Sequence, residues 1–273
     1  MKISHEVPIS LLERSREFND YDYCLAHLFH SRAKYREYYL DSVKKKRHVL
    51  LDNSIFELGT SFDPVEYAKI IEELRPTEYI VPDVLEDSQG TCEHLENWLK
   101  NYSDMPGNKI AVVQGKTYED IKTCIDFIAS KREIRKIGVS FDYSLYNDLA
   151  APYKNKLNKW QKYAVGRTLL LEKLEEDLKL PRNKKYHLLG ASLPQEFMFA
   201  SFFSFTKFMF ESVDTSNPIV HGLFKVKYTP GIGLNEKRTK KLADLIDSKV
   251  NDRQWNCIQY NVNMFKEFVT RGY

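Results

Sequence analysis

The chain has 273 residues, of which 42% are hydrophobic, and its 41 Lys and Arg residues against 38 Asp and Glu residues give a formal net charge of +3. This much apolar side chain can form a core, which excludes disorder over the whole chain and the collagen-like and low-complexity classes. We expect one domain over residues 1–273, since α/β barrels reach about 200–250 residues without dividing.

The four cysteines, at positions 24, 92, 124 and 257, are far apart and form no CxxC motif. This spacing argues against a disulfide framework and a zinc knuckle, and we expect no metal and no cofactor. The amino-terminal segment becomes charged too early to hold the apolar core of a signal peptide, and the longest apolar run, 197–210, is too short to span a membrane. We therefore expect a cytoplasmic protein.

Short β-rich segments alternate with segments of helical periodicity along the chain. The expected strands are 2–7, 23–28, 48–54, 78–84, 109–114, 136–140, 186–192 and 207–213. Helices are expected over 65–74, after Asp63 and Pro64, and over 117–131, after Thr117, because these residues favour helix starts. Eight strands with intervening helices predict an α/β fold, a TIM-like (β/α)8 barrel of parallel strands.

Three further segments complete the predicted architecture. Residues 143–182 form an expanded connection, in which we expect a helix or helix pair that acts as a lid or a substrate groove. The apolar run 197–210 is expected to be a core helix, starting near Pro194, that leads into the eighth strand. Residues 235–250 and 255–273 are expected to be C-terminal helices that cover the barrel.

Most of the expected strands run into a polar residue at the carboxyl end. These residues are Asp52, Asp83, Gln114, Ser140, Ser192 and Asp214. Each could simply cap the next helix, but the carboxyl ends of parallel barrel strands converge on one mouth, so together they favour an active site. Several carboxylates in one pocket permit two-step chemistry at a sugar carbon, or metal binding. We favour the sugar chemistry because the histidines are scattered and form no HxH or HExxH motif.

The segments LLDNSIFELG, YIVPDV, VVQG, IGVS, HLLGAS and ESVDTSNPIVHG, in this order, resemble the tRNA-guanine transglycosylase (queuine tRNA-ribosyltransferase) family. The similarity covers about residues 50–222, and the short length points to the bacteriophage branch of 7-deazaguanine DNA transglycosylases. The resemblance implies that guanine in DNA is exchanged for a 7-deazaguanine base, such as preQ0, through a covalent bond from an aspartate to C1′.

The resemblance also implies roles for individual residues. Asp214 would be the nucleophile and Asp52 the general acid and base, with Glu57 and Asp87 as the next candidates for the acid–base role. The base would be bound by Phe56, which stacks on the ring, by Asp83, which reads its guanine-like edge, and by Gln114, Gly115 and Gly138.

Departures from the family pattern affect the expected nucleic acid. The residues after Pro218 are Ile219 and Val220 where the family has Thr-Arg, and the family's C-terminal Cys/His zinc site has no counterpart. Asn53-Ser54-Ile55 replaces the family's Ser-Gly-Gly, which predicts a bulkier pocket floor. We therefore expect DNA rather than tRNA, held by basic residues that could also be solvated surface: Lys225, Lys227, Lys237, Arg238, Lys240 and Lys241.

The sequence is also compatible with other functions. A tRNA-guanine transglycosylase would act on tRNA, and a base hydrolase would use water instead of an incoming base to resolve the covalent intermediate. A barrel that only binds modified nucleic acid would have no catalytic turnover. No membrane partner is expected.

Overall fold

The computed structural model describes residues 1–153, 156–198, 209–238 and 240–271. Its eight strands form one sheet in the order β1-β8-β7-β6-β5-β4-β3-β2, and each pairing is parallel. The strands are β1 (Lys2–Ser4), β2 (Asp22–Leu25), β3 (Val49–Asp52), β4 (Glu78–Ile80), β5 (Asn108–Val112), β6 (Ile134–Ser140), β7 (Lys185–Leu189) and β8 (Phe210–Asp214). The predicted TIM-like α/β barrel is therefore confirmed.

The barrel is nearly closed, and individual hydrogen bonds bridge the gap between its first two strands. No strand ladder joins β1 to β2 within the described residues. Instead, the Ser4 hydroxyl donates a hydrogen bond to the Tyr21 carbonyl (2.7 Å), and the Asp20 amide donates to the Ile3 carbonyl (2.9 Å). These bonds satisfy backbone groups that an open sheet edge would leave unpaired.

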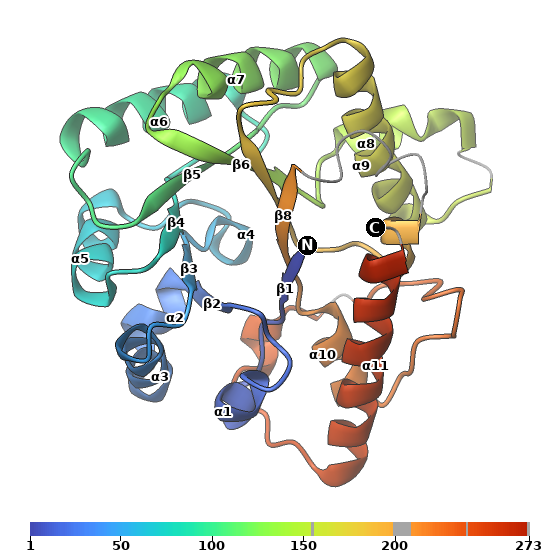
Figure 1. Ribbon diagram of the computed structural model, residues 1–273. Helices are drawn as coiled ribbons and strands as arrows, with labels where there is room; N and C mark the ends of the chain where they lie inside the picture. The colour runs from blue at the N-terminus through green and yellow to red at the C-terminus, as the bar shows by residue number, and fades with distance from the viewer. Residues whose placement is uncertain (154–155, 199–208, 239, 272–273) are drawn as a thin grey trace.

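Helices surround the strands (Figure 1). Two match the helices expected between strands: α5 (Pro64–Leu74), capped by the Asp63 carboxylate, and α7 (Tyr118–Ser130), which begins with a reciprocal capping box between Thr117 and Asp120. The other α-helices are α1 (Leu12–Ser15), α2 (Ala26–Ser31), α3 (Ala33–Lys44), α4 (Ile55–Leu58), α6 (Ser88–Asn101), α8 (Leu145–Leu149), α9 (Lys159–Glu176), α10 (Asn217–Leu223) and α11 (Asp252–Arg271). None of the helices in the described ranges has the length and apolar character to cross a membrane.

The expanded connection after β6 contains a helix pair, α8 and α9, as expected (Figure 1). Arg167 of α9 is buried and donates to the carbonyls of Leu189 (3.2 Å), the last residue of β7, and of Gly190 (3.0 Å), which follows it. Its guanidinium also pairs with the buried carboxylate of Glu196. This buried ion pair ties the connection to the carboxyl end of the barrel.

The structure corrects the prediction of a helix over 235–250. Among the described residues of this segment, the helical structure is a single 3-10 turn, η5 (Leu242–Leu245). The apolar residues Leu242 and Ile246 are buried as the helical pattern predicts, but Lys237 and Lys241 reach over aromatic rings at the barrel mouth. These contacts to distant rings favour an irregular backbone over a continuous helix in this segment.

The segment expected to form a core helix near 197–210 is described only in part. It begins with a 3-10 turn, η3 (Pro194–Met198), and residues 199–208 lie outside the described residues. The chain is described again at 209, where β8 begins one residue later.

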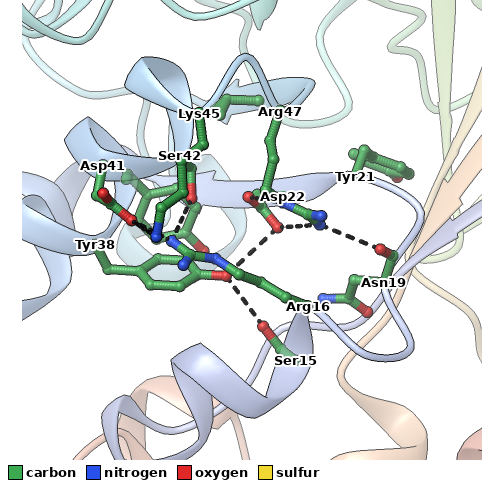
Figure 2. A network of polar contacts seen from close by, with 12 residues as sticks. Ser15, Arg16, Asn19, Tyr21, Asp22, Tyr38, Asp41, Ser42, Lys45 and Arg47 are labelled. Atoms are coloured by element: carbon green, nitrogen blue, oxygen red, sulfur yellow. Dashed lines mark hydrogen bonds and ion pairs between the residues drawn. The ribbon is translucent and has the colours of Figure 1, made fainter.

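Polar contacts hold the elements together near the amino-terminal end of β2 (Figure 2). Arg47 donates to both carboxylate oxygens of Asp22, at 2.8 and 2.9 Å. Nearby, the guanidinium of Arg16 lies 4.4 Å from the centre of the Tyr38 ring and pairs with Asp41 at 2.8 Å. Each acidic group here has a basic partner, an arrangement that suits a stabilising role.

Candidate functional site

A cavity of about 530 Å³ lies at the carboxyl end of the barrel, a volume typical of small-molecule sites. Its lining comes from the ends of the strands and the loops that follow them, from α4, from Trp160 and Tyr163 of α9, and from the segment that leads into η5. The sequence-predicted residues that line it are Asp52, Phe56, Glu57, Asp83, Gln114, Ser140, Asp214, Lys237, Arg238, Lys240 and Lys241. Residues separated by up to 189 positions in the chain therefore meet in one place.

Other predicted residues lie outside this lining. Gly115 lies in the loop before α7, where an added Cβ would be 2.6 Å from Asp120. Gly138 lies in β6, and its carbonyl accepts a hydrogen bond from the Val113 amide (3.0 Å). Ser192 does not line the cavity either; its hydroxyl donates a hydrogen bond to the Trp160 carbonyl (2.7 Å). The exposed lysines at positions 225 and 227 are also not among the lining residues of the described chain.

Asp52 is the last residue of β3 and is almost fully buried. Its two oxygens accept hydrogen bonds from the Tyr23 hydroxyl (2.7 Å) and the Ser54 amide (2.5 Å). Burial raises the pKa of Asp52 to about 7; these hydrogen bonds oppose the rise, and the charge of Asp214 adds to it. A carboxyl with this pKa exchanges a proton near neutral pH, as a general acid and base must.

Asp214 is the last residue of β8 and has a different environment. Its Oδ1 accepts from the Gly190 amide (3.2 Å) and lies 3.1 Å from Nε2 of the buried His187. Gly190 has a φ of +65°, and a Cβ there would be 2.3 Å from the Phe141 ring, so only glycine fits this turn. Among the described residues, no hydrogen-bond donor contacts Oδ2, so this oxygen can contact a ligand in the cavity.

Asp83 is held between two amide side chains. Asn53 donates to Oδ1 (2.8 Å) and Gln114 donates to Oδ2 (2.7 Å), while the Gln114 oxygen accepts from the Glu86 amide (2.9 Å). Burial raises the pKa of Asp83, and the two amide hydrogen bonds limit the rise. A carboxylate oxygen accepts about two hydrogen bonds, so Asp83 keeps acceptor capacity for a ligand.

Two further carboxylates line the cavity. Burial raises the pKa of Glu57 to about 8, and the charge of Asp52 adds to the effect. Burial likewise raises the pKa of Glu6 well above its usual range, with additional repulsion from Glu57 and Asp214. Sequence reasoning missed Glu6 because the first strand was expected to run through it; the strand ends at Ser4, and Glu6 follows as a polar residue after the strand end.

Basic side chains from 237–241 lie on aromatic rings at the mouth. Lys237 Nζ is 3.5 Å from the centre of the Phe141 ring, and burial lowers the pKa of Lys237 to about 8. Lys241 Nζ is 4.6 Å from the centre of the Phe56 ring and donates to the Phe56 carbonyl (2.7 Å). A base that stacks on this face of Phe56 therefore has to displace Lys241 from the ring.

The described residues contain no group of three or more His, Cys, Asp or Glu side chains arranged to hold a metal ion. In the comparisons with known proteins, no family model and no curated protein matches the chain.

Proposed function

We propose that this protein is a glycosyltransferase that exchanges guanine in DNA for a 7-deazaguanine base. The observation that carries the proposal is the pair Asp52 and Asp214, which come from β3 and β8, line one cavity and have different environments. Enzymes that break glycosidic bonds through a covalent intermediate use two carboxyl groups in this way, one as an acid and one as a nucleophile.

The proposed reaction has two matching halves. Oδ2 of Asp214 attacks C1′ of a 2′-deoxyguanosine residue, the bond from C1′ to N9 breaks, and Asp52 gives its proton to the departing guanine. The 7-deazaguanine base then returns its N9 proton to Asp52 and attacks C1′, which releases Asp214. A pKa of about 7 suits Asp52 for both directions, because each half needs the opposite protonation state.

We assign base selection to Asp83, whose carboxylate is held by the amides of Asn53 and Gln114. The carboxylate can accept from N1–H and from the exocyclic amine of a guanine-like edge, and an adenine-like edge would leave the buried charge without these donors. The amides of Asn53 and Gln114 fix the orientation of the carboxylate.

The nucleic acid must deliver an unstacked base to the cavity, since the reacting C1′ is otherwise inaccessible within a duplex. Arg238 and Lys240 line the mouth and can contact backbone phosphates, while Phe56 can stack on the base once Lys241 has moved. DNA is favoured over tRNA by the departures after Pro218 and by the missing Cys/His cluster in the sequence.

The experiment that tests the proposal follows labelled guanine, and separately preQ0, into DNA and into tRNA, with nucleoside mass spectrometry of the products. Incorporation into DNA without net base loss is expected. Net loss of guanine would identify a base hydrolase, modification of tRNA alone would identify a tRNA enzyme, and binding without either reaction would overturn the enzymatic proposal.

A further inference from the structure

His187 lies beneath the cavity, in the middle of β7, with no exposed surface. Its Nδ1 is 2.9 Å from the Ser212 hydroxyl, and its Nε2 is 3.1 Å from Oδ1 of Asp214. The ring is stacked on Tyr23, with 6.2 Å between ring centres and 24° between planes. Tyr23 in turn donates to Asp52, so one buried layer connects both proposed catalytic aspartates.

The surroundings of the imidazole determine which nitrogen carries hydrogen. A bare Nε2 lone pair 3.1 Å from a carboxylate oxygen would be repelled, whereas an Nε2–H group is attracted. Ser212 can donate its hydroxyl hydrogen to Nδ1, an arrangement that leaves the ring hydrogen on Nε2. The contact to Asp214 is close in distance but does not have hydrogen-bond alignment, so Nε2 has no hydrogen-bond partner in the resting protein.

We infer that His187 is a positioning residue for Asp214, directing its Nε2–H at Oδ1 so that Oδ2 faces the sugar carbon. This inference rests on the proposed function and assigns to that reaction a residue outside the cavity lining. Catalytic hydrogen bonds that are poorly aligned in the free enzyme commonly tighten when substrate binds.

The role follows from the carboxylates around Asp214. Glu6 and Asp52 line the same cavity, so the Asp214 carboxylate lies among other carboxyl groups. An N–H group that aligns with Oδ1 when substrate binds stabilises this carboxylate, and together with the Gly190 amide it fixes the plane of the carboxylate. When Oδ2 bonds to C1′, Oδ1 becomes the ester carbonyl, and the same two N–H groups still have an acceptor. His187 itself exchanges no proton.

The test compares His187→Phe, which keeps a stacked ring without N–H groups, with His187→Gln, whose amide can replace the Nε2–H. The control is His48→Phe, because His48 makes a contact of the same length, 3.1 Å, to Glu78 at the opposite end of the barrel. The assay measures steady-state exchange and single-turnover adduct formation with a labelled guanine-containing DNA oligonucleotide.

We expect His187→Phe to lower kcat and the adduct rate by roughly 10–100-fold with little change in the KM for DNA, as loss of an orienting partner typically does. His187→Gln should recover most of the loss, and His48→Phe should leave both rates unchanged. Equal rates in His187→Phe and wild type, while Asp214→Asn is inactive, would overturn the inference and leave the proposed function standing. No exchange or adduct with wild type would instead overturn the proposed function.

A second measurement does not depend on activity or on folding of a His187 variant. Histidine ¹⁵N NMR of the wild-type protein should show His187 with hydrogen on Nε2, and Asp214→Asn should shift that resonance. A His187 ring with hydrogen on Nδ1 alone would contradict the inference.

Discussion

The two ends of the barrel differ in the partners of their buried acidic side chains. At the amino-terminal ends of the strands, Lys136 lies between Glu78 (2.6 Å) and Glu211 (2.7 Å), and Asp22 pairs with Arg47. At the carboxyl ends, Glu6, Asp52 and the other cavity carboxylates repel one another.

The pKa values follow this difference. Burial alone would raise the pKa of Glu78, but the hydrogen bond from His48 and the charge and hydrogen bond of Lys136 lower it to about 2. Burial raises the pKa of Asp52 to about 7 and that of Glu57 to about 8, because no cation offsets it to the same extent. The paired acids at the amino-terminal end therefore stabilise the fold, whereas the buried carboxyls at the other end lower the stability of the folded state, as groups in functional sites do.

The largest expected effect is on activity at the carboxyl end. Asp214→Asn should lower exchange by more than roughly 10³-fold, because an amide is a poor nucleophile toward C1′. Thermal unfolding should show that the variant is folded. Intact-protein mass spectrometry with DNA and no incoming base should detect an adduct for wild type only. Normal exchange by Asp214→Asn would remove this residue from the mechanism.

The next effect is on stability at the amino-terminal end. Lys136→Met leaves Glu78 and Glu211 without their shared cation and should lower the free energy of unfolding by about 3 kcal/mol at neutral pH. The loss should shrink as the pH falls from about 4.5 toward 2, because the contribution of a carboxyl with a lowered pKa disappears in that range. Denaturant unfolding at several pH values measures it. A variant as stable as wild type would show that the pairing at this end contributes little.

Base choice should be affected at the carboxyl end by Asp83→Ala. The preference for guanine over adenine in the exchange reaction should fall by roughly 10–100-fold, because the acceptor for two guanine N–H groups is removed. Ser61→Ala serves as the control, since the Ser61 hydroxyl hydrogen-bonds the amide and carbonyl of Asp83 and leaves its carboxylate in place. Unchanged selectivity in Asp83→Ala would refute its assignment.

The smallest expected effect is a gain in stability from Asp52→Asn. A carboxyl with a raised pKa costs the folded state nothing below about pH 4 and an increasing amount as the pH rises through about 7. Asp52→Asn should therefore raise the free energy of unfolding by roughly 1–2 kcal/mol at pH 8–9, with no gain at pH 4.

The matched substitution at the other end has the opposite expected sign. Asp22→Asn removes the charge that Arg47 contacts at 2.8 Å and should destabilise the protein at the same pH. Urea unfolding of both variants decides the comparison. Destabilisation by both would show that the two ends do not differ in the way described.

The sequence by itself was sufficient to predict the barrel and the position of its principal acids. The eight strands are short β-rich segments separated by segments of helical periodicity, and Asp52 and Asp214 end two of them. Since parallel strands have their carboxyl ends on one side, identifying the strands already places both aspartates at the same mouth.

Only the tertiary structure decided how the site is completed. The contact between His187 and Asp214 and the position of Glu6 depend on strand register and on the early end of β1, which local residue patterns do not encode. The pattern at 235–250 favoured a helix, but Lys237 and Lys241 contact rings of Phe141 and Phe56, which are distant in sequence. Local propensities are worth only tenths of a kcal/mol per residue, so such long-range contacts readily outweigh them.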